Sequence, residues 1–225
     1  MLIRMLVATL VWLIAAEFAQ ANPVAFAFTG HITVISSLDP FDPFPDPISD
    51  DAAAPSTFAG IFTFDSAAAD AIPDPQTGNY ASNGGPFGFT LSLGGLTFNF
   101  GGVNIGILND FVTFFPVQTY DEYLASYSET PTDTNPTGVQ LQIALNDFTG
   151  TAFTNDALPL APPMLSAFSN SIYPAQFWFT DTINGNQVEL FGSLDSLTTV
   201  PEPGTLFLLS PGIWLLVRRR QSRNG

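Results

Sequence analysis

The sequence contains no cysteine and no lysine, and its single histidine is His31. Without cysteine the chain has no disulfides, thiolate metal sites or thiol nucleophile, and a domain of this size can build its core without disulfides. One histidine is also too few for a zinc site. A Ser-His-Asp triad would have to use His31, yet no nucleophile-elbow pattern occurs. Because His31 alternates with threonines, we expect an ordinary histidine on the solvent-facing side of a strand.

Positive charge is confined to the two ends of the chain. Of the 20 acidic residues, 18 lie between residues 22 and 200, where there is no lysine or arginine. Such a body should repel nucleic acid and anionic membranes, and it should attract divalent cations or basic surfaces. The simplest interpretation is an acidic coat that keeps the protein soluble, with no nucleic-acid partner.

The sequence also lacks the motifs of common enzymes. There is no phosphate-cradling loop and no dinucleotide-binding glycine pattern. A pair of glycosidase carboxylates does not stand out among so many acids, and the only glutamates of the body are Glu122, Glu129 and Glu189. We therefore expect no catalytic residues and no enzyme, and a divergent secreted hydrolase is the last alternative.

Residues that favour strands and turns are abundant. The 225 residues include 22 Phe, 19 Pro and 18 Gly, and good helix formers are few outside the ends. This composition predicts an all-β domain, and the length allows one domain with short terminal segments.

Alternation of apolar and polar residues predicts the individual strands. The clearest lies at 139–145, and others lie at 26–34 and 58–64. Two hairpins are expected, 87–93 with 96–100 across Gly94-Gly95, and 176–182 with 187–194 across Asn184-Gly185. Eight or more short strands with one buried face predict a single β-sandwich or jelly-roll-like domain made of two sheets.

An extended acidic loop is expected at 38–51, because its many prolines exclude a central strand. Carboxylates suit Ca²⁺, and the loop offers Asp39, Asp42, Asp46, Asp50 and Asp51. Their spacing matches no EF-hand loop, so specific Ca²⁺ binding competes with diffuse association of counter-ions. No other metal or cofactor is expected.

Two further stretches are interpreted as loops. The first, 65–79, is acidic and is predicted to contain one helical turn at 66–71. The second carries Tyr120, Tyr123 and Tyr127. These tyrosines are either a platform that stacks on the sugars of an exopolysaccharide or one face of a short helix packed on the strands.

Residues 1–21 have the pattern of a secretory signal peptide. Arg4 supplies the positive charge, 6–16 form an apolar run, and Ala19-Gln20-Ala21 is a small-x-small cleavage pattern. Cleavage there would make Asn22 the mature start. The alternative is an uncleaved anchor, for which this run is short, since a span needs about 20 apolar residues.

Residues 199–225 have the pattern of a sorting and anchoring tail that follows a body at 22–198. Pro201-Glu202-Pro203 is stiff and extended, and Arg218, Arg219 and Arg220 should stay on the cytoplasmic side of the membrane. Between them lies a predicted hydrophobic anchor helix, whose apolar residues are Leu206, Phe207, Leu208, Leu209, Ile213, Trp214, Leu215, Leu216 and Val217. The alternative is a hydrophobic C-terminal strand with a basic tail.

This tail resembles the PEP-CTERM sorting signal of Gram-negative bacteria. The resemblance implies an exosortase-type processing enzyme as a partner, which acts near the Pro-Glu-Pro segment, and release to the cell surface or extracellular matrix. The body resembles a recurrent group of PEP-CTERM proteins with no established activity, in the stretches AFAFTGHITVI, GIFTFDSAAAD and GSLDSLTTVPEP.

The apolar part of the tail departs from that family in its length. Thr205 to Val217 gives only 13 residues, interrupted by Pro211; as a helix this is about 20 Å, against a bilayer core of about 30 Å. We therefore expect a transient hold in the inner membrane before the body reaches the surface or matrix. The expected function is that of a non-enzymatic structural or adhesive protein, and the alternative is a carbohydrate-binding module acting on exopolysaccharide or another matrix polymer.

Overall fold

The computed structural model describes residues 22–37, 57–114, 117–129, 138–168, 175–183 and 186–201. The strands are β1 (Pro23–Ser37), β2 (Thr57–Asp65), β3 (Thr77–Ser82), β4 (Gly88–Leu93), β5 (Leu96–Gly101), β6 (Val103–Phe114), β7 (Val117–Ser128), β8 (Gln140–Asp147), β9 (Ala175–Ile183) and β10 (Asn186–Thr199). Helical structure among these residues is limited to one 3₁₀ turn, η1 (Leu165–Phe168). The all-β prediction is confirmed. The predicted signal peptide and anchor helix lie outside the described residues.

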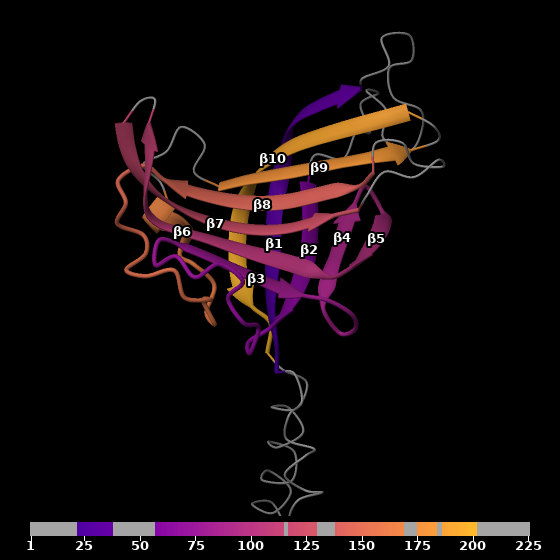
Figure 1. Cartoon of the computed structure of the whole chain (residues 1–225). Helices are drawn as coiled ribbons and strands as arrows, with labels where there is room; N and C mark the ends of the chain where they lie inside the picture. Colours follow the sequence, from indigo (N-terminus) through magenta and orange to yellow (C-terminus); the bar gives the residue numbers. More distant parts are fainter. Residues whose placement is uncertain are drawn as a thin grey trace, which may run out of the picture.

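All ten strands belong to one antiparallel sheet, in the order β3-β6-β7-β8-β9-β10-β1-β2-β4-β5. The sequence pattern predicts two sheets, and the structure instead joins both halves through β10 and β1. These strands are long, with 14 and 15 residues, and their pairing shifts between Thr29 and Gly30 and between Ile32 and Val34. Such irregularities let paired strands bend. The sheet thus folds over, and β1, β2, β4 and β5 cross behind β6 to β9 (Figure 1).

Aromatic side chains from the two halves meet in the core. Phe58 of β2 stacks on Phe177 of β9 with ring centres 4.0 Å apart, and Phe98 of β5 packs on Phe179 of β9 at 5.4 Å. Burial of each such ring stabilises the fold by about 1.5–3 kcal/mol. Strict alternation of buried and half-buried residues along β8 confirms the strand predicted at 139–145.

Two glycines allow rings to lie flat against the sheet. A Cβ atom at Gly30 would collide with the Phe58 ring and with the carbonyl oxygen of Ser193. At Gly60 it would collide with the Phe28 ring and with a backbone oxygen of β4. Glycine is therefore needed at both positions, because the Phe58 ring lies over Gly30 and the Phe28 ring lies over Gly60.

Both predicted hairpins form. In the β4–β5 hairpin, Gly94 and Gly95 have φ values of 57° and 83°, which a two-residue turn requires and glycine tolerates. In the β9–β10 hairpin Ile183 pairs with Asn186; the two turn residues lie outside the described part of the chain.

The structure corrects one of the two predicted loops and the helical turn in the other, since most of 65–79 does lie between β2 and β3. The stretch with the three tyrosines is strand β7, which the alternation missed because Asp121 points inward and Leu124 is only half-buried on the other face. The stretch 66–71 is not helical: Ala68 N–H donates to Asp65 C=O in a turn, and β3 begins at Thr77.

Buried carboxylates hold the long segment between β8 and η1. Asp121 and Asp147 are cross-strand partners and fully buried. Asp121 accepts backbone N–H groups of Asp110 and Phe153, both at 2.7 Å. Asp147 accepts the backbone N–H and the hydroxyl of both Thr149 and Thr151. Burial raises the pKa of Asp147, but these hydrogen bonds outweigh burial and hold the pKa below its ordinary value.

The two ends of the body leave the sheet side by side. Phe26 of β1 pairs with Thr199 of β10, and Val200 N–H donates to Ala25 C=O at 2.8 Å. Both strands reach the same end of the molecule, at the bottom of Figure 1. Whatever follows residue 201 is therefore attached at the end where the body begins.

Candidate functional site

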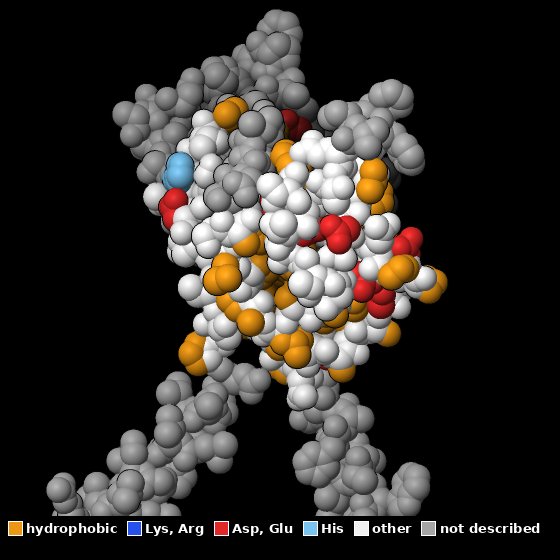
Figure 2. Space-filling view, turned by 90° about the vertical axis from the view of Figure 1, so that its left-hand side faces the viewer, with side chains coloured by type: hydrophobic (Ala, Val, Ile, Leu, Met, Phe, Trp, Pro, Cys, Tyr) orange, Lys and Arg blue, Asp and Glu red, His pale blue; other side chains and the backbone are white. Residues whose placement is uncertain are grey.

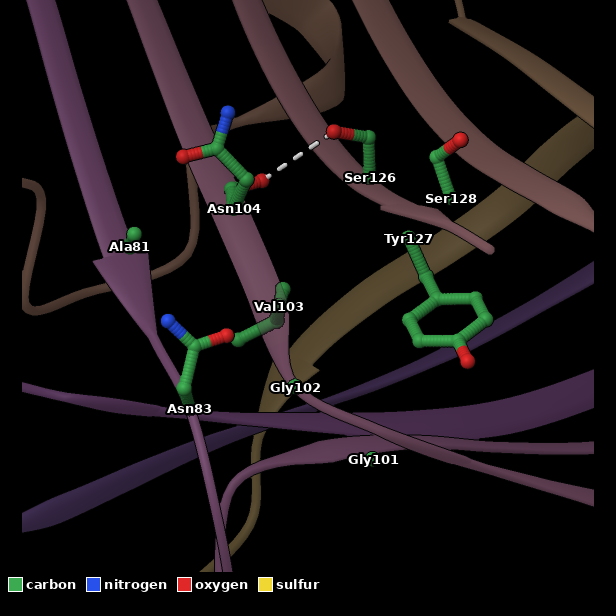
Figure 3. Close-up of a pocket in the computed structure, with 9 residues that line it drawn as sticks. All are labelled: Ala81, Asn83, Gly101, Gly102, Val103, Asn104, Ser126, Tyr127 and Ser128. Atoms are coloured by element: carbon green, nitrogen blue, oxygen red, sulfur yellow. Dashed lines mark hydrogen bonds between the residues drawn. The ribbon is translucent and has the colours of Figure 1, made fainter. Parts of the chain in front are cut away.

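A groove of about 280 Å³ opens where β5 passes into β6, beside the ends of β3 and β7 (Figure 3). Its volume is at the lower limit of small-ligand sites, roughly 300 Å³. It is lined by Ala81, Asn83, Gly101, Gly102, Val103, Asn104, Ser126, Tyr127 and Ser128.

Strand pairing positions the walls of this groove. Ala81, Asn104 and Ser126 form a row across β3, β6 and β7, because Ala81 pairs with Asn104 and Asn104 with Ser126. Gly102, with φ of 107°, lets the chain pass from β5 into β6. A Cβ atom there would come within 3.1 Å of the Asn83 side chain.

The polar groups of the groove are neutral. Asn104 Oδ1 is buried without a hydrogen-bond partner, and the Ser126 hydroxyl donates to the backbone oxygen of Asn104 at 3.4 Å. The Tyr127 ring packs on Phe100 at 5.1 Å. Burial, and then the charge of Glu129, raise the pKa of Tyr127, so its hydroxyl stays protonated and can donate.

This arrangement is suited to binding, because nothing that lines the groove would activate the hydroxyl groups of Ser126, Tyr127 and Ser128 for catalysis. No carboxylate, imidazole or cation lines the groove. Amide and hydroxyl groups with one aromatic ring match ligands that carry many hydroxyl groups.

A second hollow of about 170 Å³ lies on the outer side of β3, β6 and β7 and contains Glu122. Burial raises the pKa of this carboxyl group. Glycoside hydrolysis requires two carboxyl groups facing each other. Glu122 is the only carboxyl group among the described residues that line this hollow, so a facing pair is not seen there.

His31 lies on the surface, as the sequence predicts. Its Nδ1 is 3.0 Å from an oxygen of Asp195, and both side chains are about half exposed, at 51% and 56%. Figure 2 shows the histidine beside an acidic side chain. No hydroxyl group completes a triad with this pair among the described residues.

The predicted cation-binding and sorting residues are not tested by the structure. Asp39, Asp42, Asp46, Asp50 and Asp51 lie outside the described residues, as does the tail from Glu202 onward. Within the described ranges no cluster of three or more His, Asp or Glu side chains could hold a metal ion.

The three tyrosines do not form a platform. They all belong to β7, where Tyr123 is completely buried and Tyr120 lies on the opposite face. Tyr120 instead makes edge-to-face contacts with Phe111 at 5.7 Å and Phe148 at 6.2 Å. Only Tyr127 reaches a candidate site.

Sequence reasoning missed the groove because its residues come from three separate stretches and include no charged group. One signal was available. No charged residue occurs between Asp74 and Asp110, and most of the groove comes from this interval.

No protein family, no curated protein and no solved structure matches this chain. Among the residues described, no helix is long and apolar enough to cross a membrane.

Proposed function

We propose that the chain is a non-enzymatic protein that is exported, held transiently in the inner membrane by its C-terminal tail, and delivered to the cell surface or extracellular matrix of a Gram-negative bacterium. There it acts as a structural or adhesive component. An exosortase-type enzyme that recognises Pro201-Glu202-Pro203 would process it.

The adjacent ends of β1 and β10 carry this proposal. Because the body begins and ends at one pole, a tail can hold it there while the rest of the surface faces outward. The positive-inside rule applies to the residues next to a span, and Arg218, Arg219 and Arg220 of the tail would therefore stay on the cytoplasmic side. The neutral groove lies beside strand ends and offers binding chemistry only.

Fractionation of the native host, with mass spectrometry of both termini, tests export and processing. We expect a protein in the envelope or medium that starts at Asn22 and ends near residue 203. Glu202→Gln should leave the protein unprocessed in the inner membrane, whereas Glu129→Gln in the body should behave as wild type. An intact N-terminus in the cytoplasm would refute the proposal.

The groove supports a second candidate, binding of a neutral exopolysaccharide. The Asn83 amide and the Tyr127 hydroxyl of the groove (Figure 3) favour it, because both can exchange hydrogen bonds with sugar hydroxyl groups. Affinity electrophoresis of the full chain in neutral polysaccharide gels would show retardation. Asn83→Ala should weaken retardation, and Asn155→Ala, in an exposed loop, should leave it unchanged; equal mobility with and without polysaccharide would exclude this function.

A further inference from the structure

We propose that the outer edge of β5 pairs antiparallel with β5 of a second copy of this chain. This inference goes beyond export, and it holds for the body wherever the body resides. It names an interaction surface, Leu96–Gly101, and one occupant for it.

On its outer side the backbone of β5 presents N–H and C=O groups that no described residue pairs with. Leu93 and Leu96 flank the two-residue turn, and Gly102 N–H donates to Phe87 C=O at 3.1 Å. In an antiparallel ladder every second residue points its N–H and C=O toward the same neighbour. Since Leu96, Phe98, Phe100 and Gly102 point toward β4, the groups of Thr97, Asn99 and Gly101 point away.

No described strand covers that side. β5 is the last strand of the sheet order and lies at the margin of the molecule in Figure 1. Thr97, Asn99 and Gly101 are exposed, and Phe98 and Phe100 are half-buried. β5 has none of the features that usually protect an edge strand, namely a charge, a proline or a bulge.

Charge favours a second copy as the occupant. The chain carries a formal net charge of −15, so two copies repel each other over most of their surface. Between Asp74 and Asp110 there is no charged residue, and β5 lies inside this interval. β5 and the rest of its hairpin therefore add no charge of their own to a contact between two copies.

The chain's own segment 38–56 is a poor occupant. It has prolines at 40, 43, 45, 47 and 55, which lack the N–H groups that a paired strand must donate. The edge of β5 needs a partner with an uninterrupted row of donors and acceptors, and β5 itself has one.

Two-fold symmetry fixes the register. With Asn99 facing Asn99 of the second copy, Thr97 faces Gly101, and the three outward residues exchange about six hydrogen bonds. Phe98 then faces Phe100 of the second copy across the new strand pair. Both copies contribute the same surface, so the contact closes as a dimer.

Charge substitutions at Asn99 test this register. In the full chain in mild detergent, sedimentation velocity should show a concentration-dependent dimer. Asn99→Asp and Asn99→Lys should each weaken dimerisation, by up to roughly fivefold for like charges directly opposite each other. An equimolar mixture of the two should restore it, and thermal melts should show that both variants fold. Asn155→Asp, the same change in an exposed loop, should leave the dimer intact.

The absence of cysteine allows a second, independent test. Asn99→Cys should give a disulfide-linked dimer on mild oxidation, because a hydrogen-bonded cross-strand pair places Cα atoms about 5.5 Å apart. Asn155→Cys should stay monomeric. The proposal is overturned if the wild-type chain is monomeric at all concentrations, if Asn99→Asp behaves as Asn155→Asp, or if both cysteine variants cross-link equally.

Discussion

The two edge strands of the sheet, β3 and β5, differ in whether other residues hydrogen-bond to their outer edge. At β3, Asp70 Oδ1 accepts the backbone N–H groups of Ile72 and Asn79, and Ala71 N–H donates to Asn79 C=O at 2.9 Å. The chain thereby closes its own edge. At β5 no described residue does the same. The difference follows the acidic residues, which precede β3 in the sequence and do not occur in the β4–β5 hairpin.

The comparison changes the interpretation of the acidic composition. The sequence suggests a solubilising coat, yet several aspartates have a defined structural task. Asp65, Asp70 and Asp74 each accept the N–H two residues further on, and Asp121 and Asp147 hold the segment after β8. In a body without lysine or arginine, backbone N–H groups are the available partners for carboxylates.

The largest effect is expected for Asp121→Ala. This change leaves two partly buried backbone N–H groups, of Asp110 and Phe153, without an acceptor. We expect the free energy of unfolding to fall by about 3 kcal/mol, measured by urea denaturation. Asp195→Ala, which removes an exposed carboxylate, should change it by less than about 0.5 kcal/mol. Equal losses would show that burial and hydrogen bonding of Asp121 contribute little.

The next largest effect is a loss of folding stability at low pH. Folding lowers the pKa of Asp147, so its contribution to stability is complete above the unfolded pKa of about 4 and is lost as pH falls through the folded pKa. Asp147→Asn should cost about 2 kcal/mol at pH 6. The difference from wild type should shrink toward pH 2, and a difference independent of pH would contradict this role.

Removing Asp70, which covers the β3 edge, should lower the free energy of unfolding by less. Asp70→Ala removes the acceptor of two partly exposed N–H groups and should lower stability by about 1 kcal/mol. It should also loosen the cover over β3 and increase self-association. Asp74→Ala is the matched control, because Asp74 caps a turn without bonding to Asn79. No change in self-association would mean that Asp70 does not guard this edge.

The smallest effect has the opposite sign. Folding raises the pKa of Glu122, so stability present at low pH is lost as pH rises through the folded pKa. Glu122→Gln should therefore raise the melting temperature at pH 7 by roughly 1–2 °C, and the gain should vanish near pH 4. The exposed Glu129→Gln serves as control. A lower melting temperature for Glu122→Gln would contradict the claim that folding raises the pKa of Glu122.

The sequence predicts most of the strands of this fold, but it does not predict that one sheet bends so that its two halves pack against each other. Strands with one apolar face, such as β8, and the turn at Gly94-Gly95 are local signals. β7 was missed because its inward positions include Asp121, whose partners Asp110 and Phe153 are supplied by distant parts of the chain. The single folded sheet depends on bends in β1 and β10, which no residue pattern marks. The groove joins three stretches of sequence that only the strand order brings together.

Amide hydrogen exchange of the full chain at low and high concentration tests most directly whether one edge is closed and the other left for a partner. The N–H of Asn79 should be protected at both concentrations, because Asp70 accepts it within one copy. The N–H of Asn99 should exchange freely at low concentration and become protected at high concentration. Equal protection of Asn99 at both concentrations, or none at either, would contradict the account.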